Sequence, residues 1–368
     1  MRILLWPTHY LPHIGGLEIM THALAIQLKN IGHKVFVISN HSNSLEFEEN
    51  SIEGIKIFTF PFVTALFDYN LPLIKKILQK IDQIFEDFSP DIVNIHGWFE
   101  CFAFYQVHIL QKKSLPLCLT IHGLLEQSHY HTNFCLKLWS RASSVSTVSQ
   151  ALISSLAQIE MTHHSLQLIY NGLPLPLSPL QPISNPLHLV LIGRLSEEKC
   201  FDVAFYAIKM LIAKYPNLKV HLLGGGILYK DLFQLRNSLE LEHVIEMTDF
   251  LPPDQIYNYI DQSSAVIIPS SYESFCLVAL QAALRARPVV ASNVYGLKEV
   301  VEHNKTGILV EPKNPKTLAE GIDQLLSNFA KMKQMGEEAY MRGKTLFTIQ
   351  NTAKNYVEMY ENVVCTSC

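Results

Sequence analysis

A chain of 368 residues is longer than one hydrophobic core usually supports, and its length predicts two domains. With 48% hydrophobic and 17% charged residues, the composition excludes an intrinsically disordered protein. The formal net charge, 29 basic minus 33 acidic residues or −4, excludes the strongly basic surface that is typical of nucleic-acid binding.

The first part of the chain alternates short apolar runs with helical patterns, which is typical of a parallel sheet covered by helices. A strand at 2–6 precedes the pair Gly15-Gly16 and a helix from about Leu17. Apolar residues spaced by 3.6 residues predict this helix and another over 74–88. Further strands are predicted at 34–39, 55–60, 91–96, 116–122, 145–149 and 166–170.

A proline-rich segment interrupts this alternation, because residues 171–186 contain five prolines that fix the backbone and remove donors. We predict a linker there, between a first domain at 1–170 and a second at 187–345. The second domain has predicted strands at 187–192, 218–223, 244–247, 265–268, 288–292 and 307–310. An amphipathic helix within 346–368 is expected to pack back on the first domain. The predicted fold class is α/β, with two Rossmann-like lobes facing a central cleft.

Cysteine usage and the first residues favour a cytoplasmic protein. The cysteines are scattered, without the dense framework of a small secreted domain, and Cys365 and Cys368 form a lone C-x-x-C that we interpret as a tail. The apolar run before Pro7 is too short for a secretory signal. The uncharged stretch at 161–193 contains prolines that a membrane-spanning helix does not tolerate.

Several common motifs of α/β enzymes are absent. Gly224-Gly225-Gly226 follows a predicted strand, but Tyr229 stands where a dinucleotide-binding fingerprint needs its third glycine. The sequence has no phosphate-binding P-loop, no G-x-S-x-G and no H-E-x-x-H. These absences disfavour dinucleotide-binding enzymes, the common α/β hydrolases and metal hydrolases.

Two loops in the second domain carry the residues best suited to chemistry. The string G-R-L-S-E-E-K at 193–199 follows one predicted strand, and S-S-Y-E-S-F-C-L-V-A-L-Q-A at 270–282 follows another. Arg194 and Lys199 are suited to gripping a diphosphate and neutralising it as it departs. Glu273 precedes a helix expected to start near Phe275, and a carboxylate there suits the hydroxyls of a sugar. Taken singly, each has an ordinary alternative as a solvated surface charge, a helix cap or an ion-pair partner.

The chain resembles glycosyltransferase family 4, the retaining enzymes with the two-lobed GT-B fold. The resemblance covers nearly the whole length. Besides the two strings above, it rests on Gly15-Gly16 and on D-I-V-N-I-H, T-I-H-G, S-T-V-S, Y-N-G, P-V-V-A-S-N-V-Y-G-L-K-E and T-G-I-L-V, in that order.

The resemblance implies a role for each matching residue. Arg194 and Lys199 would hold the donor diphosphate, and Glu273 would bind hydroxyls of the donor sugar. Amides of Phe275, Cys276 and Leu277 would face phosphate, and Gln281 would meet the ribose. In the other, acceptor-side lobe, Gly15 and Gly16 would approach the donor phosphates and His122 would lie over the transferred sugar. The resemblance implies that the sugar moves from a nucleoside diphosphate to an unknown acceptor, such as a cell-surface glycan or lipid-linked precursor, without a metal and without a bound cofactor.

The sequence departs from the family pattern at four positions. Gln281 replaces the second carboxylate of E-x7-E, Ser274 and Cys276 replace glycines, and Asp249 stands where glycine is common. Two other activities on the same fold therefore stay open, a nucleotide-sugar epimerase and an inactive nucleotide-sugar-binding protein. A sugar-binding transport receptor with two α/β lobes is disfavoured, because no export signal is found.

Residues of the first domain give two open hypotheses. A group of aromatic and histidine residues is suited equally to an acceptor cleft or to packing: His9, His13, Trp98, Phe99, His129 and Tyr130. Five lysines suit either a solvated face or contact with the inner face of a membrane: Lys75, Lys76, Lys80, Lys112 and Lys113.

Overall fold

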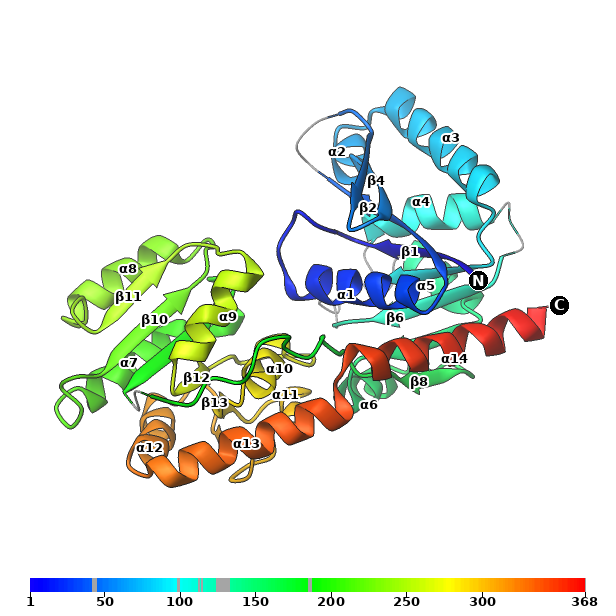
Figure 1. Ribbon diagram of the computed structural model, residues 1–368. Coiled ribbons are helices and arrows are strands. Elements are labelled where there is room, and N and C mark those ends of the chain that lie inside the picture. Colours follow the sequence, from blue (N-terminus) through cyan, green and yellow to red (C-terminus); the bar gives the residue numbers. More distant parts are fainter. Residues whose placement is uncertain are drawn as a thin grey trace. The chain divides into compact units, whose positions relative to one another are not determined.

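The computed structural model describes residues 1–41, 45–97, 100–111, 113, 115–123, 133–184 and 187–367. The chain folds into two compact units. Unit 1 comprises Met1–Gly172 together with Ile349–Cys368, and unit 2 comprises Leu173–Thr348. Each unit is built on one sheet, and all paired strands are parallel except one edge strand of unit 1 (Figure 1). The predicted α/β class, with two parallel-sheet domains, is confirmed.

Unit 1 contains an eight-stranded sheet with the order β3-β4-β2-β1-β5-β6-β7-β8. Its strands are β1 (Arg2–Pro7), β2 (Lys34–Asn40), β3 (Glu48–Ile52), β4 (Ile55–Phe60), β5 (Ile92–His96), β6 (Leu117–Ile121), β7 (Ser144–Thr147) and β8 (Leu166–Leu168). Its helices are α1 (Gly16–Asn30), α2 (Phe62–Phe67), α3 (Leu71–Phe88), α4 (Glu100–Leu110), α5 (Asn133–Arg141), α6 (Gln150–Gln158) and α14 (Ile349–Ser367). The strand order reverses between β1 and β5, and ligands of such sheets bind beyond the carboxyl ends of strands at that point.

The C-terminal helix α14 belongs to unit 1 and packs against α1. Two of its tyrosines, Tyr356 and Tyr360, are completely buried. The Tyr360 hydroxyl accepts a hydrogen bond of 2.7 Å from the Asn94 side chain on β5, and Asn94 in turn accepts one from Thr120. Because a buried hydroxyl without a partner is costly, this polar contact specifies where the helix docks.

Unit 2 contains a six-stranded parallel sheet with the order β11-β10-β9-β12-β13-β14. Its strands are β9 (His188–Ile192), β10 (Lys219–Leu223), β11 (Ile245–Thr248), β12 (Ala265–Ile268), β13 (Val289–Ser292) and β14 (Gly307–Val310). Its helices are the 3-10 turn η2 (Glu197–Lys199), α7 (Phe201–Leu211), α8 (Tyr229–Ser238), α9 (Pro253–Gln262), α10 (Leu277–Leu284), α11 (Leu297–Val300), α12 (Pro315–Leu326) and α13 (Phe329–Leu346). Counted along the chain, the order is 3-2-1-4-5-6, that of dinucleotide-binding sheets, with its reversal between β9 and β12.

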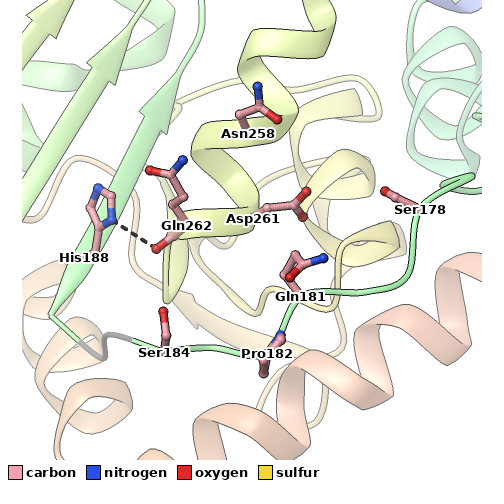
Figure 2. Close-up of a pocket in the computed structure, with 8 residues that line it drawn as sticks. All are labelled: Ser178, Gln181, Pro182, Ser184, His188, Asn258, Asp261 and Gln262. Carbon is pink, nitrogen blue, oxygen red and sulfur yellow. Dashed lines mark hydrogen bonds between the residues drawn. The ribbon is translucent and has the colours of Figure 1, made fainter.

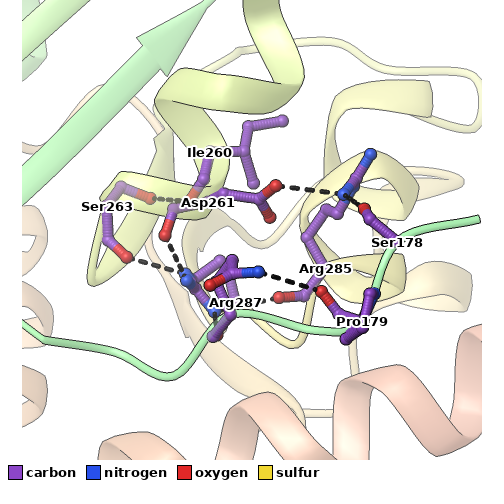
Figure 3. A network of polar contacts seen from close by, with 8 residues as sticks. Ser178, Pro179, Ile260, Asp261, Ser263, Arg285 and Arg287 are labelled. Atoms are coloured by element: carbon purple, nitrogen blue, oxygen red, sulfur yellow. Dashed lines mark hydrogen bonds and ion pairs between the residues drawn. The ribbon is translucent and has the colours of Figure 1, made fainter. Parts of the chain in front are cut away.

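The proline-rich segment is fixed to unit 2 over much of its length. Arg287 is 1% exposed, and its guanidinium donates to the main-chain carbonyls of Gln181, Ser263, Asp261 and Arg285 (Figure 3). Arg285 bonds the Asp261 carboxylate and the Ser178 hydroxyl. The sequence predicted a linker over 171–186, whereas the division between units falls after Gly172 and buried arginine contacts hold the following segment.

A shallow polar hollow of about 680 Å³ lies beside this segment. Figure 2 shows the residues that line it: Ser178, Gln181, Pro182, Ser184, His188, Asn258, Asp261 and Gln262. His188 is the first residue of β9, so the hollow lies at the amino end of that strand. It is therefore at the opposite end of the sheet from the loops at 193–199 and 270–276.

Candidate active site

The glycine triplet after β10 shapes the loop that carries Arg194. A Cβ atom on Gly224 would lie 2.0 Å from the Gly193 carbonyl oxygen, and one on Gly226 would lie 2.6 Å from the Leu195 carbonyl oxygen. The Leu195 amide donates to the Gly225 carbonyl at 2.9 Å. The triplet thus lets two backbones pack together at the carboxyl ends of β9 and β10, which explains its glycines without a dinucleotide.

Lys199 and Glu273 form an ion pair, although 74 residues separate them in the chain. The Lys199 Nζ atom lies 2.7 Å from Glu273 Oε1, and the two side chains are 21% and 12% exposed. The Ser270 hydroxyl donates to the same Oε1 atom at 2.9 Å. The loops are tied further by the Ser271 amide, which donates to the Glu198 carbonyl at 2.8 Å. The pair bridges the ends of neighbouring strands β9 and β12, where the strand order reverses.

The Lys199 ammonium stays charged at this position. Burial alone would lower the pKa of Lys199, but the charge and hydrogen bond of Glu273 outweigh it, so the net shift is upward. Arg194, on the same loop, is exposed. Within the described part of the chain, its guanidinium has no hydrogen bond or ion-pair partner. Glu197 and Glu198 balance the two cations of this loop in formal charge. Because Lys199 is paired with Glu273, Arg194 is the loop cation that stays available to an incoming anion.

The start of α10 places backbone amides beside the ion pair. Cys276 precedes the helix with φ of 77°, a left-handed conformation that favours glycine, so it occupies a backbone position suited to the glycine it replaces. This turn delays the helix start to Leu277, two residues after the predicted Phe275. Phe275 is buried and stacks edge-on against Phe347. Helix N-terminal amides attract anions, although an eight-residue helix does so weakly by itself.

Gln281 lies on the second turn of α10 and is buried, with 4% of its surface exposed. Burial raises the pKa of Tyr257 on α9, and the Gln281 side chain partly offsets this rise, as a polar group near the phenol does. The Arg285 guanidinium lies over the Tyr257 ring, 4.6 Å from the centroid. Gln281 is therefore held in a defined orientation on the face of α10 toward α9.

In unit 1, Gly15 precedes α1, and the helix begins at Gly16. The carboxylate of Glu18 in the first turn folds back over this N-terminus, because a Cβ atom on Gly15 would lie 2.4 Å from its Oε2 atom. Glu18 is 5% exposed, and its Oε1 atom lies 3.0 Å from Nδ1 of His13. An incoming phosphate at Gly15 and Gly16 would meet a carboxylate that already lies at this helix terminus.

His122 follows β6 and pairs with His96, the last residue of the neighbouring strand β5. Nδ1 of His96 and Nε2 of His122 are 3.0 Å apart. Burial lowers the pKa of His122 to about 3, and burial together with His122 lowers that of His96 well below its usual value. Both rings are therefore neutral at pH 7, and one ring N–H donates to the other ring. This bond does not use Nδ1 of His122.

The proposed acceptor-side residues are only partly described. The rings of His9 and His13 stack with centroids 4.8 Å apart. Trp98, Phe99, His129, Tyr130 and Lys112 lie outside the described residues. Within the described ranges, no group of three or more histidine, cysteine or acidic residues is arranged to hold a metal ion. No helix among them has the length and apolar character needed to cross a membrane.

Sequence reasoning missed two features of these sites. One is Glu18 at the start of α1, whose only signal in the sequence was a carboxylate two residues after the pair Gly15-Gly16. The other is the pairing of His96 with His122. This pairing could have been predicted, because both histidines stand at the carboxyl ends of predicted strands and the carboxyl ends of neighbouring parallel strands meet at one edge of the sheet.

Two family models account for most of the chain. The model described as "Glycosyltransferase Family 4" matches residues 14–175, and the one described as "Glycosyl transferases group 1" matches residues 180–342. The chain belongs to the family 4 glycosyltransferases. Its two units have the GT-B architecture of that family.

Curated relatives and solved structures agree with this assignment. This family 4 glycosyltransferase is 26% identical to an uncharacterised glycosyltransferase of Methanocaldococcus jannaschii over 98% of both chains. It is 25% identical to a glycogen synthase of Mycobacterium tuberculosis, over 98% of this chain and 94% of the relative.

Two solved structures share the fold across almost the full length. Sucrose-phosphate synthase from Thermosynechococcus elongatus covers all of both chains with a TM-score of 0.82 at 19% identity. HepE of Anabaena, solved with UDP and glucose, has a TM-score of 0.79 at 20% identity and covers 98% of this chain and 99% of its own.

Proposed function

We propose that this glycosyltransferase moves a sugar from a nucleoside diphosphate to an acceptor hydroxyl, with retention at the anomeric carbon and without a metal ion. The ion pair between Lys199 and Glu273 carries the proposal. It places a half-buried ammonium and a carboxylate together at the strand-order reversal of unit 2, on the loop that also carries exposed Arg194. A diphosphate needs the cations, and a sugar needs an acceptor of hydroxyl hydrogen bonds.

In the proposed reaction the bond from the anomeric carbon to the diphosphate oxygen breaks, and a bond from that carbon to the acceptor oxygen forms. The proton of the acceptor hydroxyl passes to an oxygen of the departing diphosphate. Arg194 and Lys199 stabilise the charge that develops on the leaving group, together with amides at the start of α10. Glu273 accepts from sugar hydroxyls, and its Oε2 atom is not used by the bonds from Lys199 and Ser270. No protein nucleophile takes part.

The structural neighbour HepE supports the choice of donor, because it has been solved with UDP and with UDP-glucose. The donor base and sugar of this chain are open within that class, as is the acceptor, for which a cell-surface glycan or a lipid-linked precursor is suited. Glu273 and the cations would also serve an epimerase or a binding protein. These alternatives are favoured by Gln281, which replaces a family carboxylate.

Incubating the protein with radiolabelled nucleotide sugars and a panel of glycan and lipid-linked acceptors separates the three functions. We expect label in a new glycoside whose anomeric configuration, read by NMR, equals that of the donor. A changed sugar on the nucleotide would identify an epimerase, and binding without turnover would identify an inactive binding protein. Inversion at the anomeric carbon would refute the retaining mechanism.

Gln281→Glu is expected to tighten nucleotide binding about tenfold, since hydrogen bonds to a charged acceptor are worth roughly 1.5–3 kcal/mol against about 1 for neutral ones. A carboxylate can accept from both ribose hydroxyls, and the Tyr257 hydroxyl can donate to it. Titration calorimetry with the nucleoside diphosphate measures the change.

Gln255→Glu adds the same charge at an exposed position of α9 and is the matched control. Weaker nucleotide binding by Gln281→Glu, with an unchanged melting temperature, would contradict the prediction that residue 281 accepts hydrogen bonds from both ribose hydroxyls. Unchanged affinity in Gln281→Ala would show that this residue does not reach the ribose.

His122→Ala is expected to lower kcat at least tenfold while changing donor affinity much less, because a neutral imidazole near the transferred sugar acts in the transition state. Steady-state kinetics and donor titration together measure this split. His163→Ala is the control, since His163 bonds only main-chain groups of unit 1, and we expect it to lower the melting temperature without changing kcat. If His122→Ala behaves like His163→Ala, His122 is structural.

A further inference from the structure

The turn between α2 and α3 exposes three large apolar side chains within five residues. Phe67 is 70% exposed, Tyr69 86% and Leu71 72%. We name these three residues the apolar tip. In Figure 1 the turn lies where α2 meets the first turn of α3, at the upper margin of the drawing. Single exposed apolar residues are ordinary, but three that protrude together from one turn indicate a binding surface.

The backbone of the turn holds these side chains outward. Tyr69 has φ of 47°, a left-handed conformation that is unfavourable for an aromatic residue. The turn is fixed by the amides of Tyr69 and Asn70, which donate to the carbonyls of Leu66 and Ala65. The Asn70 side chain caps α3 by accepting from the Leu73 amide at 3.1 Å. The tip is therefore ordered before it meets a partner, and docking costs little conformational entropy.

Positive charge lies directly behind the apolar tip. Lys75 and Lys76 are exposed and follow Leu71 by one helical turn, which is about 6 Å along the axis of α3. Residues 62–80 contain three lysines and one aspartate, a net charge of 3 − 1 = +2. The positive end of the α3 dipole also points toward the tip. Lys113 adds less to this positive charge, because its ammonium lies 3.5 Å from the Asp82 carboxylate, which offsets it.

We propose that the apolar tip docks this protein on an anionic lipid bilayer. Phe67, Tyr69 and Leu71 enter the boundary between headgroups and acyl chains, and Lys75 and Lys76 lie at the level of the lipid phosphates. Tyrosine is suited to this depth, because its ring is apolar and its hydroxyl stays hydrated. A protruding turn backed by lysines fits a fluid anionic surface better than a protein groove. This proposal is independent of the donor chemistry.

Co-sedimentation with vesicles tests the proposal on the full chain. We expect binding to vesicles of phosphatidylglycerol and phosphatidylcholine, with weaker binding to pure phosphatidylcholine and at higher salt. The triple change Phe67→Ser, Tyr69→Ser and Leu71→Ser should reduce the partition coefficient at least tenfold. Lys75→Gln and Lys76→Gln should each reduce it about fivefold on anionic vesicles only.

Met341→Ser on α13 and Met210→Ser on α7 are matched controls, because both residues are 56% exposed and belong to unit 2, whereas the tip belongs to unit 1. We expect both to bind vesicles like the wild type. The tip residues contribute little to the core, so the triple variant should keep its melting temperature. As a second measurement, Tyr69→Trp should gain fluorescence that anionic vesicles shift to the blue and brominated lipid quenches.

Three results would overturn the proposal. The first is that the wild-type protein binds anionic vesicles no better than neutral ones at low salt. The second is that the folded triple variant binds vesicles like the wild type. The third is that the fluorescence of Tyr69→Trp does not change when the protein is bound to vesicles. Concentration-dependent self-association that the triple variant loses, without vesicle binding, would show that a second copy of the chain covers the tip.

Discussion

Lys199→Ala is expected to reduce sugar transfer at least 100-fold, because it removes leaving-group stabilisation of about 3 kcal/mol. A second effect adds to the loss. In the wild type Lys199 neutralises Glu273 across 2.7 Å, and without it a partly buried carboxylate faces the diphosphate. Affinity for the nucleoside diphosphate should therefore fall as well, by about tenfold or more. Initial rates and titration calorimetry measure the two losses separately.

The double variant Lys199→Ala with Glu273→Gln distinguishes these two effects. Removing the carboxylate charge should restore part of the diphosphate affinity lost in Lys199→Ala. Transfer should stay low, because the cation is still missing and a neutral amide accepts from sugar hydroxyls less strongly than a carboxylate. Such non-additivity is the signature of two side chains in direct contact. Lys209→Ala on α7 is the matched control, because it breaks only the exposed ion pair of Lys209 with Glu240. It should change neither the transfer rate nor the diphosphate affinity. If the double variant binds the diphosphate more weakly than Lys199→Ala, the carboxylate does not oppose the phosphate.

Much of the fold could be predicted because parallel strands are buried on both faces and therefore appear as short apolar runs. The strands at 55–60 and 265–268 were predicted with the bounds observed for β4 and β12. Strand β3 was missed, since its sequence E-E-N-S-I has no apolar alternation and its residues are mostly exposed. It forms only because its antiparallel pairing with β4 satisfies its backbone at the sheet edge. Tertiary pairing, not local pattern, creates such a strand.

The residues of the candidate donor site could be predicted from the sequence, but the ion pair between Lys199 and Glu273 could not. Parallel strands bring the loops at 193–199 and 270–276 to one edge of the sheet, so their proximity follows from topology. Which cation approaches Glu273 depends on the η2 turn and on Cys200, which has φ of 49° after it. From the sequence, Arg194 and Lys199 were predicted to play the same role. In the structure Lys199 forms an ion pair with Glu273, whereas Arg194 is exposed. Arg194→Ala and Lys199→Ala should consequently differ in their effects on diphosphate affinity.

Arg194→Ala is expected to reduce transfer about 100-fold, since one charge-assisted contact to a departing oxyanion is worth on the order of 3 kcal/mol. Unlike Lys199→Ala, it exposes no carboxylate, so its effect on binding should depend on the phosphate alone. Affinity for a nucleoside diphosphate should fall more than affinity for the monophosphate, and added salt should narrow the difference between variant and wild type.

Arg194→Lys keeps the charge but loses the planar fork of the guanidinium, and we expect it to recover part of the rate. Arg236→Ala on α8 is the matched control, because that half-buried arginine bonds Asn237 and the carbonyl of Ile245, the first residue of β11, at the opposite end of the sheet from the loop that carries Arg194. Equal losses of mono- and diphosphate affinity in Arg194→Ala would place Arg194 at the nucleoside instead of the diphosphate. A wild-type rate in folded Arg194→Ala would exclude Arg194 from the leaving-group site. Lys199, whose charge Glu273 offsets, would then have to stabilise the departing charge as the remaining cation of the loop.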